Sequence, residues 1–213
     1  MAWLVVLGIF SIWILIEFLQ APIVIRSAVS ANLSEAINNA RQLGMMLFEF
    51  EAEYGKFPDS ATIPEVRMKH HSNILTLSDR TSNDLFTQLF AAEIATSEAF
   101  FYASAKSAKR PDNIFGSNVT ALAHGETSFA YISGLSAYSD PPHTPLVFGP
   151  VIPGTTTLDT KSCEGFAIIL WLDNSVTTFK YDSTGKIMDH GLDLLDPRQP
   201  YWHGKAPDVK WPK

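Results

Sequence analysis

Side chains with strong chemistry are few in this chain and widely scattered. Its imidazole groups belong to six histidines: His70, His71, His124, His143, His190 and His203. None of them pairs with another at four-residue spacing around a carboxylate, the arrangement by which one helix face holds zinc. Cys163 is the single cysteine, has no distinctive histidine context and is interpreted as a partly buried thiol. No phosphate loop or nucleophile elbow is present either, so the sequence predicts a protein that is not an enzyme.

Four aspartates near the C-terminus are the remaining candidates for a metal site: Asp189, Asp193, Asp196 and Asp208. Carboxylate and loop carbonyl oxygens are the ligands that Ca²⁺ prefers. The spacing of the four matches no known calcium loop, so turn-forming and helix-capping roles are favoured, with Ca²⁺ as the alternative. No other cofactor is expected.

Three aromatic side chains in the C-terminal tail are candidates for a partner-binding surface. Tyr201, Trp202 and Trp211 lie within residues 191–213, a stretch rich in proline and tryptophan. The alternative, which we favour, is an ordered tail that wraps over a sheet and packs these aromatic rings against it.

The elements that position these residues begin with an apolar N-terminal segment. Twenty of the first 25 residues are hydrophobic, and Glu17 is the only charged one among them. About 20 mainly apolar residues suffice to cross a bilayer, so residues 1–25 are predicted to form a single membrane span. A cleaved signal peptide is the alternative, although no Lys or Arg precedes the apolar run as a signal peptide requires.

Two residues of this segment bear on assembly. Glu17 either meets a cationic group on a neighbouring subunit or lies at headgroup level near the end of a tilted span, because an unpaired carboxylate inside a bilayer is costly. Pro22 is expected to kink the helix near its exit from the membrane.

A helical period continues beyond Pro22. Apolar side chains recur there in steps of three and four, the spacing of one buried stripe: Val29, Leu33, Ala36, Ala40, Leu43, Leu47, Phe50 and Tyr54. Gly55 and Pro58 then end the pattern. The sequence predicts an amphipathic stem over residues 26–55, continuous with the span and packed on a sheet of the same chain. A coiled coil is the alternative.

Residues 56–213 are predicted to form a globular head. A second helix is expected after a cap at Ser82 or Asn83, and four strand patterns follow, at residues 128–133, 145–152, 165–172 and 175–182. Helices followed by antiparallel strands indicate the α+β class. The formal net charge of −6, from 16 basic and 22 acidic side chains, excludes a dense phosphate-binding surface, so no nucleic acid is expected as a partner.

Residues 36–59, AINNARQLGMMLFEFEAEYGKFPD, resemble the stem of type IV pilins and type II secretion pseudopilins, which ends at a similar Tyr-Gly-x-Phe-Pro motif. The stretches PDNIF, GETSFAYISGLS, VIPGT, LDNSV and DLLDPRQPYWHGKAPDVKWP also resemble this group, so the likeness covers most of the chain. The resemblance implies a pilin-like fold, in which one long N-terminal helix, membrane span plus amphipathic stem, packs on a C-terminal antiparallel sheet.

The same resemblance implies a non-enzymatic structural subunit of a type II secretion or type IV pilus-like assembly. Such a subunit is anchored in the bacterial inner membrane with its head periplasmic or extracellular, and its partners are other pilin-like subunits or secretion-machinery proteins, up to a homo-oligomeric filament. Family members also carry a Gly-Phe cleavage junction followed by a Glu. Here that junction is missing, and matching Pro22 to the family's proline places Val5 at the position of the acid. This departure favours the alternative, a membrane-tethered interaction module that does not polymerise.

Overall fold

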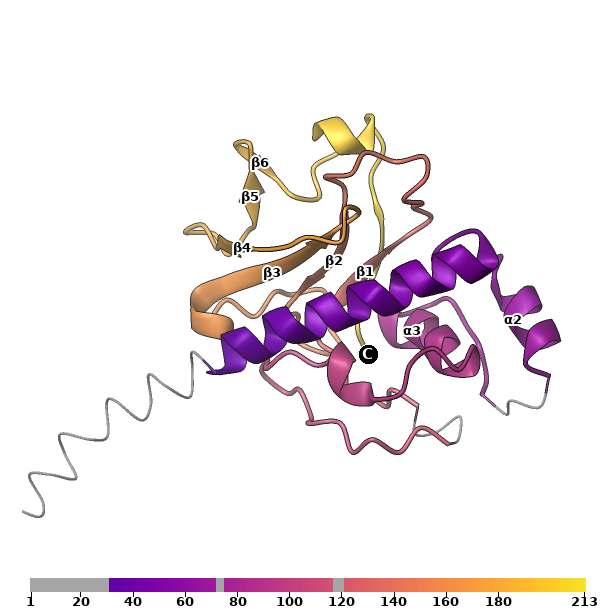
Figure 1. Ribbon diagram of the computed structural model, residues 1–213. Helices are drawn as coiled ribbons and strands as arrows, with labels where there is room; N and C mark the ends of the chain where they lie inside the picture. The colour runs from indigo at the N-terminus through magenta and orange to yellow at the C-terminus, as the bar shows by residue number, and fades with distance from the viewer. Residues whose placement is uncertain (1–30, 72–74, 117–120) are drawn as a thin grey trace, which may run out of the picture.

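A long helix and a five-stranded sheet dominate the computed structural model, which describes residues 31–71, 75–116 and 121–213 (Figure 1). The long helix covers residues 31–54. Gly55 ends it in a left-handed conformation with φ of 77°, as its position after the apolar stripe predicts. Two shorter helices follow, α2 (Ile63–Lys69) and α3 (Ser82–Ala91). The cap of α3 is Thr81 rather than Ser82 or Asn83, because Thr81 and Asp84 form a reciprocal capping box.

The sheet is antiparallel throughout and has the strand order β4-β3-β2-β1-β7. Its strands are β1 (Ala130–Ser133), β2 (Pro145–Gly149), β3 (Phe166–Trp171), β4 (Val176–Lys180) and β7 (Asp208–Lys210). The first four confirm the four predicted strands. A two-stranded ribbon and three 3₁₀ turns complete the elements: β5 (Met188–Asp189), β6 (Leu192–Asp193), η1 (Glu98–Phe101), η2 (Cys163–Gly165) and η3 (Pro200–Trp202). Because β7 pairs with β1, the C-terminal tail becomes an edge of the sheet.

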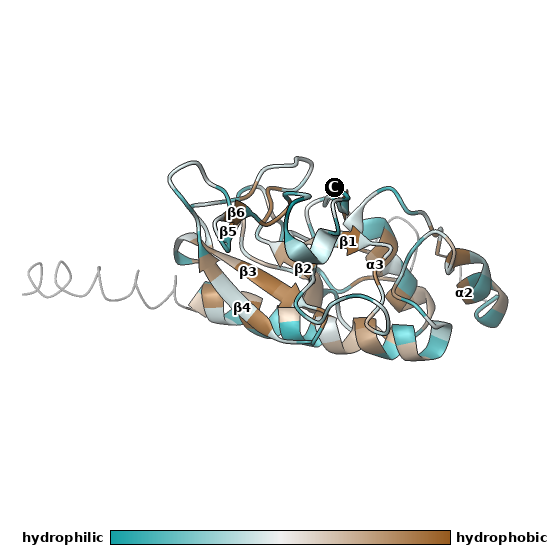
Figure 2. Cartoon of the chain, turned by 90° about the horizontal axis from the view of Figure 1, so that it is seen from above, coloured by the Kyte–Doolittle hydropathy of each residue, from teal (hydrophilic) through white to brown (hydrophobic). Residues whose placement is uncertain are grey.

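Strand β3, which lies between β2 and β4, is buried on both faces, which explains its uninterrupted apolar sequence. Ile168 and Leu170 belong to the core beneath the long helix, whereas Ala167, Ile169 and Trp171 belong to a second core on the opposite face. This alternation follows from the two-residue period of a strand. In Figure 2, β3 is largely brown, whereas the edge strand β4 is paler.

The long helix packs on one face of the sheet through its apolar stripe (Figure 1). The members of that stripe from Ala36 onward are buried: Ala36, Ala40, Leu43, Leu47, Phe50 and Tyr54. Gly44 marks the closest approach, since a Cβ there would lie 2.3 Å from Oδ1 of Asn174 and 2.9 Å from Cδ1 of Leu170. Packing on a sheet of the same chain, rather than in a coiled coil, is therefore confirmed for this helix.

The predicted pilin-like fold is wrong in its long apolar helix. Among residues 31–71, 75–116 and 121–213, no helix combines the length and the apolar character needed to cross a bilayer. The helix of residues 31–54 is amphipathic because its outer side, with Arg41, Met45 and Glu49, is exposed. The predicted span at residues 1–25 lies outside the described residues. The α+β class and the antiparallel sheet are confirmed.

Candidate functional site

The three aromatic residues of the C-terminal tail lie in the second core, on the sheet face opposite the long helix. Tyr201 and Trp202 are only 7% and 6% exposed, and Nε1 of Trp202 donates to the carbonyl oxygen of Leu194 at 2.8 Å. Trp211 is partly buried, with its ring edge-on to Phe148 at a centroid distance of 5.7 Å. The three rings thus pack against the sheet, as the alternative of an ordered tail describes. Contact with a partner stays a prediction.

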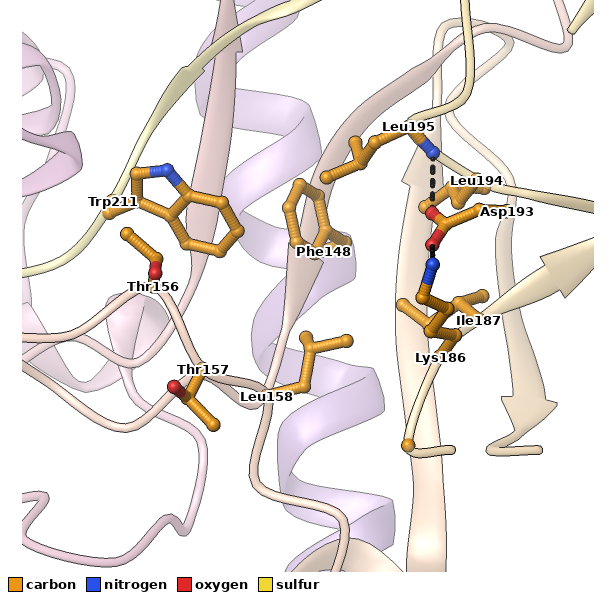
Figure 3. A pocket seen from close by; sticks show the side chains of 11 residues that line it. Phe148, Thr156, Thr157, Leu158, Lys186, Ile187, Asp193, Leu194, Leu195 and Trp211 are labelled. Carbon is orange, nitrogen blue, oxygen red and sulfur yellow. Dashed lines mark hydrogen bonds and ion pairs between the residues drawn. The ribbon is translucent and has the colours of Figure 1, made fainter. Parts of the chain in front are cut away.

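Even so, the aromatic tail borders two surface hollows. The first, of about 270 Å³, lies between Trp211 and Phe148 on one side and the β5–β6 ribbon on the other (Figure 3). At its rim Lys186 forms an ion pair with Asp193 at 3.1 Å, and Asp193 also accepts the backbone N–H of Leu195 at 3.0 Å. The Lys186 ammonium and the Leu195 N–H therefore both find their partner in the Asp193 carboxylate.

The second hollow is larger and more apolar. It has a volume of about 490 Å³, and its walls include Trp171, Phe179 and Tyr201, with His143 and His190 beside them. Burial, followed by the charge of Asp189, raises the pKa of the Tyr201 hydroxyl, so that group remains a neutral donor at physiological pH. A mostly apolar wall with a few polar groups is the usual composition of a small-molecule or side-chain pocket.

The four aspartates considered for Ca²⁺ do not form a group of three acids close enough for one ion in the part of the chain that the structure describes. Each has a basic partner instead. Asp196 binds Arg198 at 2.6 Å and Asp208 binds Lys210 at 3.1 Å. Asp189 lies 2.9 Å from Nδ1 of His190, and Asp193 lies 3.1 Å from Nζ of Lys186. The turn-forming interpretation describes Asp193 and Asp196, whose carboxylates accept backbone N–H groups two residues ahead.

A different acidic cluster, which the sequence analysis did not identify, consists of Glu98, Asp112 and Glu126. One carboxylate oxygen from each residue lies within 4.8 Å of those of the other two. Glu98 opens η1, where Ser97 caps the turn through its hydroxyl, and it is 0% exposed. Glu126 is 6% exposed and lies just before β1, whereas Asp112 is exposed at the rim.

Backbone donors hold the two buried carboxylates of the cluster. Oε2 of Glu98 accepts the N–H of Asn113 at 2.7 Å, and Oε2 of Glu126 accepts the N–H of Ala123 at 2.6 Å. Oε1 of Glu98 is buried and has no hydrogen-bond partner. Burial is the first cause that raises the pKa of Glu98, and the neighbouring charge of Glu126 is the second. Burial also raises the pKa of Glu126.

Sequence reasoning missed this cluster because the spacing of its members matches no known metal-binding motif. They are spaced fourteen residues apart in irregular segments, and no helical or loop template joins them. The single hint was the position of Glu98 within an otherwise apolar run, SEAFFYA, where a solvated acid is unexpected.

Cys163, predicted to be a partly buried thiol, is buried. Cys163 is 2% exposed, and burial, followed by the charge of Asp159, raises the pKa of its thiol to about 12. A thiol with that pKa is not a nucleophile at neutral pH. His70 lies 3.9 Å from the carboxylate of Glu93. Glu17 and Pro22, the candidate assembly residues, lie outside the described residues.

Comparison with protein-family models, with curated proteins and with solved structures gives no match for this chain.

Proposed function

We propose that this chain is a non-enzymatic structural subunit of a pilin-like assembly, of the type II secretion or type IV pilus kind. Its apolar N-terminal sequence would hold it in the bacterial inner membrane, with the α+β head on the periplasmic or extracellular side. Its partners would be further copies, other pilin-like subunits or proteins of the secretion machinery. No catalytic step and no bound cofactor is needed for this role.

The observation that supports the proposal is the two-sided character of the helix at residues 31–54. Its inner side packs into the core on one face of the sheet, while Met45, on the outer side, is 50% exposed. A helix that is fixed on its own head from one side leaves the other side free for a neighbouring subunit.

Cysteine crosslinking through this outer side tests the proposal. Met45 and Ala52 are both exposed and stand seven residues apart, which is two helical turns along one face. At that separation, about 10 Å along the axis, two cysteines cannot form a disulfide within one helix. A head-to-tail filament joins different patches of successive subunits. The double variant Met45→Cys, Ala52→Cys should therefore give a ladder of crosslinked species in cells.

Controls separate a filament from a simple dimer. Each single variant should give dimers at most, because a chain with one accessible cysteine cannot extend a ladder. The unmodified chain should stay uncrosslinked, since its own Cys163 is buried. Monomer alone from the double variant at native expression would contradict the filament proposal.

That outcome would favour the second candidate, a membrane-tethered interaction module that does not polymerise. The observation in its favour is the apolar hollow beside Trp171, Phe179 and Tyr201, which could take an apolar group of a partner. Phe179→Ala, on the edge strand β4, should then weaken capture of that partner.

A further inference from the structure

We infer that Glu98, Asp112 and Glu126 form a binding site for one divalent cation with a preference for oxygen ligands, namely Ca²⁺. This inference does not depend on the proposed function, because it rests only on the geometry within one head.

The donor set fits that ion. Three carboxylates, each with an oxygen within 4.8 Å of the other two, can converge on a single ion placed between them. Ligands in calcium sites lie 2.3–2.6 Å from the ion, so three oxygens that are mutually about 4.5 Å apart or closer can share it. Carboxylate oxygens without any sulfur or imidazole ligand select Ca²⁺, Mg²⁺ or Mn²⁺ over zinc and copper. Ca²⁺ tolerates the irregular, partly protein-bound geometry of such a loop cluster better than Mg²⁺ does.

An unpaired buried oxygen is the independent observation that points to a ligand. Glu98 is 0% exposed, its carboxyl group takes part in the cluster, and its Oε1 has no hydrogen-bond partner. Buried polar atoms are nearly always satisfied, and an orphaned one commonly marks a missing ion or water. A cation between the three acids would satisfy Oε1 and neutralise the repulsion between Glu98 and Glu126.

No protein cation performs this task in the described residues. Lys109 is near enough to Glu126 for its charge to lower the pKa of that carboxyl. It nevertheless forms no ion pair within 4.0 Å with any of the three acids. The acids that pair with lysine or arginine elsewhere in the head, such as Asp196 and Asp193, lie within 4.0 Å of their partners.

Binding would join three segments that are distant in sequence. Glu98 lies in η1, Asp112 in the loop after it, and Glu126 in the turn before β1. The last of these already holds the chain end, because the N–H of Gly125 donates to the carbonyl oxygen of Lys213 at 2.8 Å. An ion at this point would therefore clamp the irregular half of the head to the C-terminal tail.

Calcium titration of the full chain in detergent tests the inference. Chelator-treated protein should bind Ca²⁺ saturably in calorimetry. At about 100 times the dissociation constant, the ion should raise the melting temperature by about 5–10 °C. Mg²⁺ alone should give a smaller shift. Glu98→Gln and Glu126→Gln should abolish the shift.

Two further variants keep the test decisive if a buried substitution disturbs folding. Asp112→Asn, at the exposed rim, should leave the fold intact and weaken Ca²⁺ binding by about tenfold or more, because the charge of the ligands sets affinity. Glu51→Gln is the matched control. Glu51 is 2% exposed, like the cluster acids, but Ser136 and Ala137 already donate to its Oε1 at 2.7 and 3.0 Å. It should keep the full response to Ca²⁺.

Either of two results would overturn the inference. One is the absence of saturable binding at millimolar Ca²⁺, which would indicate that the carboxyl groups share a proton instead of an ion. The other is an undiminished shift in Asp112→Asn and Glu98→Gln, which would place the ion elsewhere.

Discussion

Asp159 and Glu98 are two buried carboxylates with opposite surroundings. Asp159 is 6% exposed, and its oxygens accept the N–H of Lys106 at 2.6 Å, the hydroxyl of Ser162 at 2.8 Å and the N–H of Lys161 at 3.1 Å. Burial raises the pKa of Asp159, but these hydrogen bonds together outweigh burial, and the pKa is lowered. Glu98 is more deeply buried, keeps one oxygen unpaired and has acids as neighbours, so its pKa is raised.

The difference shows how to tell a structural carboxylate from a candidate ligand. A buried charge is tolerated when donors from its own chain surround it, because they replace the lost hydration. The loop of Asp159 supplies those donors from within the chain. The cluster of Glu98 leaves Oε1 without a donor, and a proton or a cation would supply the missing partner.

The largest expected effect is on the Asp159 side of the comparison. Asp159→Asn should lower the free energy of unfolding by about 2–3 kcal/mol. The amide NH₂ group cannot accept hydrogen bonds, so at least one donor that now binds a carboxylate oxygen would lose its acceptor. Chemical denaturation measures this. Glu164→Gln, an exposed neighbour that loses the same charge, should change stability by no more than about 0.5 kcal/mol. Equal losses in both variants would show that net charge, not the hydrogen bonds, is responsible.

The stability contributions of Asp159 and of the Glu98 cluster should change in opposite directions with pH. The pKa of Asp159 is lower in the folded chain than its ordinary value of 3.8, so its contribution is present above that value and is lost as the pH falls through the folded pKa. The pKa values of Glu98 and Glu126 are raised from 4.5. In the presence of chelator, their contribution should therefore decline as the pH rises above 4.5 toward the folded pKa.

Denaturation curves from pH 4 to pH 7 in chelator measure that decline. It should be reduced in Glu98→Gln and unchanged in Glu51→Gln. A decline that is equally steep in Glu98→Gln would mean that another group causes it. Added Ca²⁺ should reverse it in the unmodified chain, because the ion favours the ionised carboxylates.

The smallest effect is expected for Glu98→Gln itself in chelator at neutral pH. The change in the free energy of unfolding should stay within about 1 kcal/mol, since the substitution removes a repelled charge and supplies an amide donor where Oε1 has no partner. The same denaturation measurement applies. A loss as large as that of Asp159→Asn would show that the Glu98 carboxylate is structurally satisfied, and the contrast between the two sites would fail.

Much of the fold was predictable because local periodicity reports burial directly. The three-and-four spacing from Ala36 to Tyr54 and the apolar run of β3 each match one physical environment, a helix with one covered side and a strand covered on both faces. Helix α3 was placed correctly but its cap was not, since the adjacent residues Thr81, Ser82 and Asn83 are all good caps and only the backbone geometry selects one. The long apolar helix was predicted from composition, and no helix of that kind occurs in the described residues.

The sequence by itself indicated the long helix, α3 and strands β1 to β4, because their patterns depend on neighbours a few residues away, but it indicated neither α2 nor β7. Only the tertiary structure decided which polar side chains meet. Asp189, Asp193, Asp196 and Asp208 are close in sequence, yet each has its own basic partner, whereas Glu98, Asp112 and Glu126 are far apart and converge. The physical reason is that irregular segments carry no period, so their side chains are brought together by packing against the core rather than by local spacing.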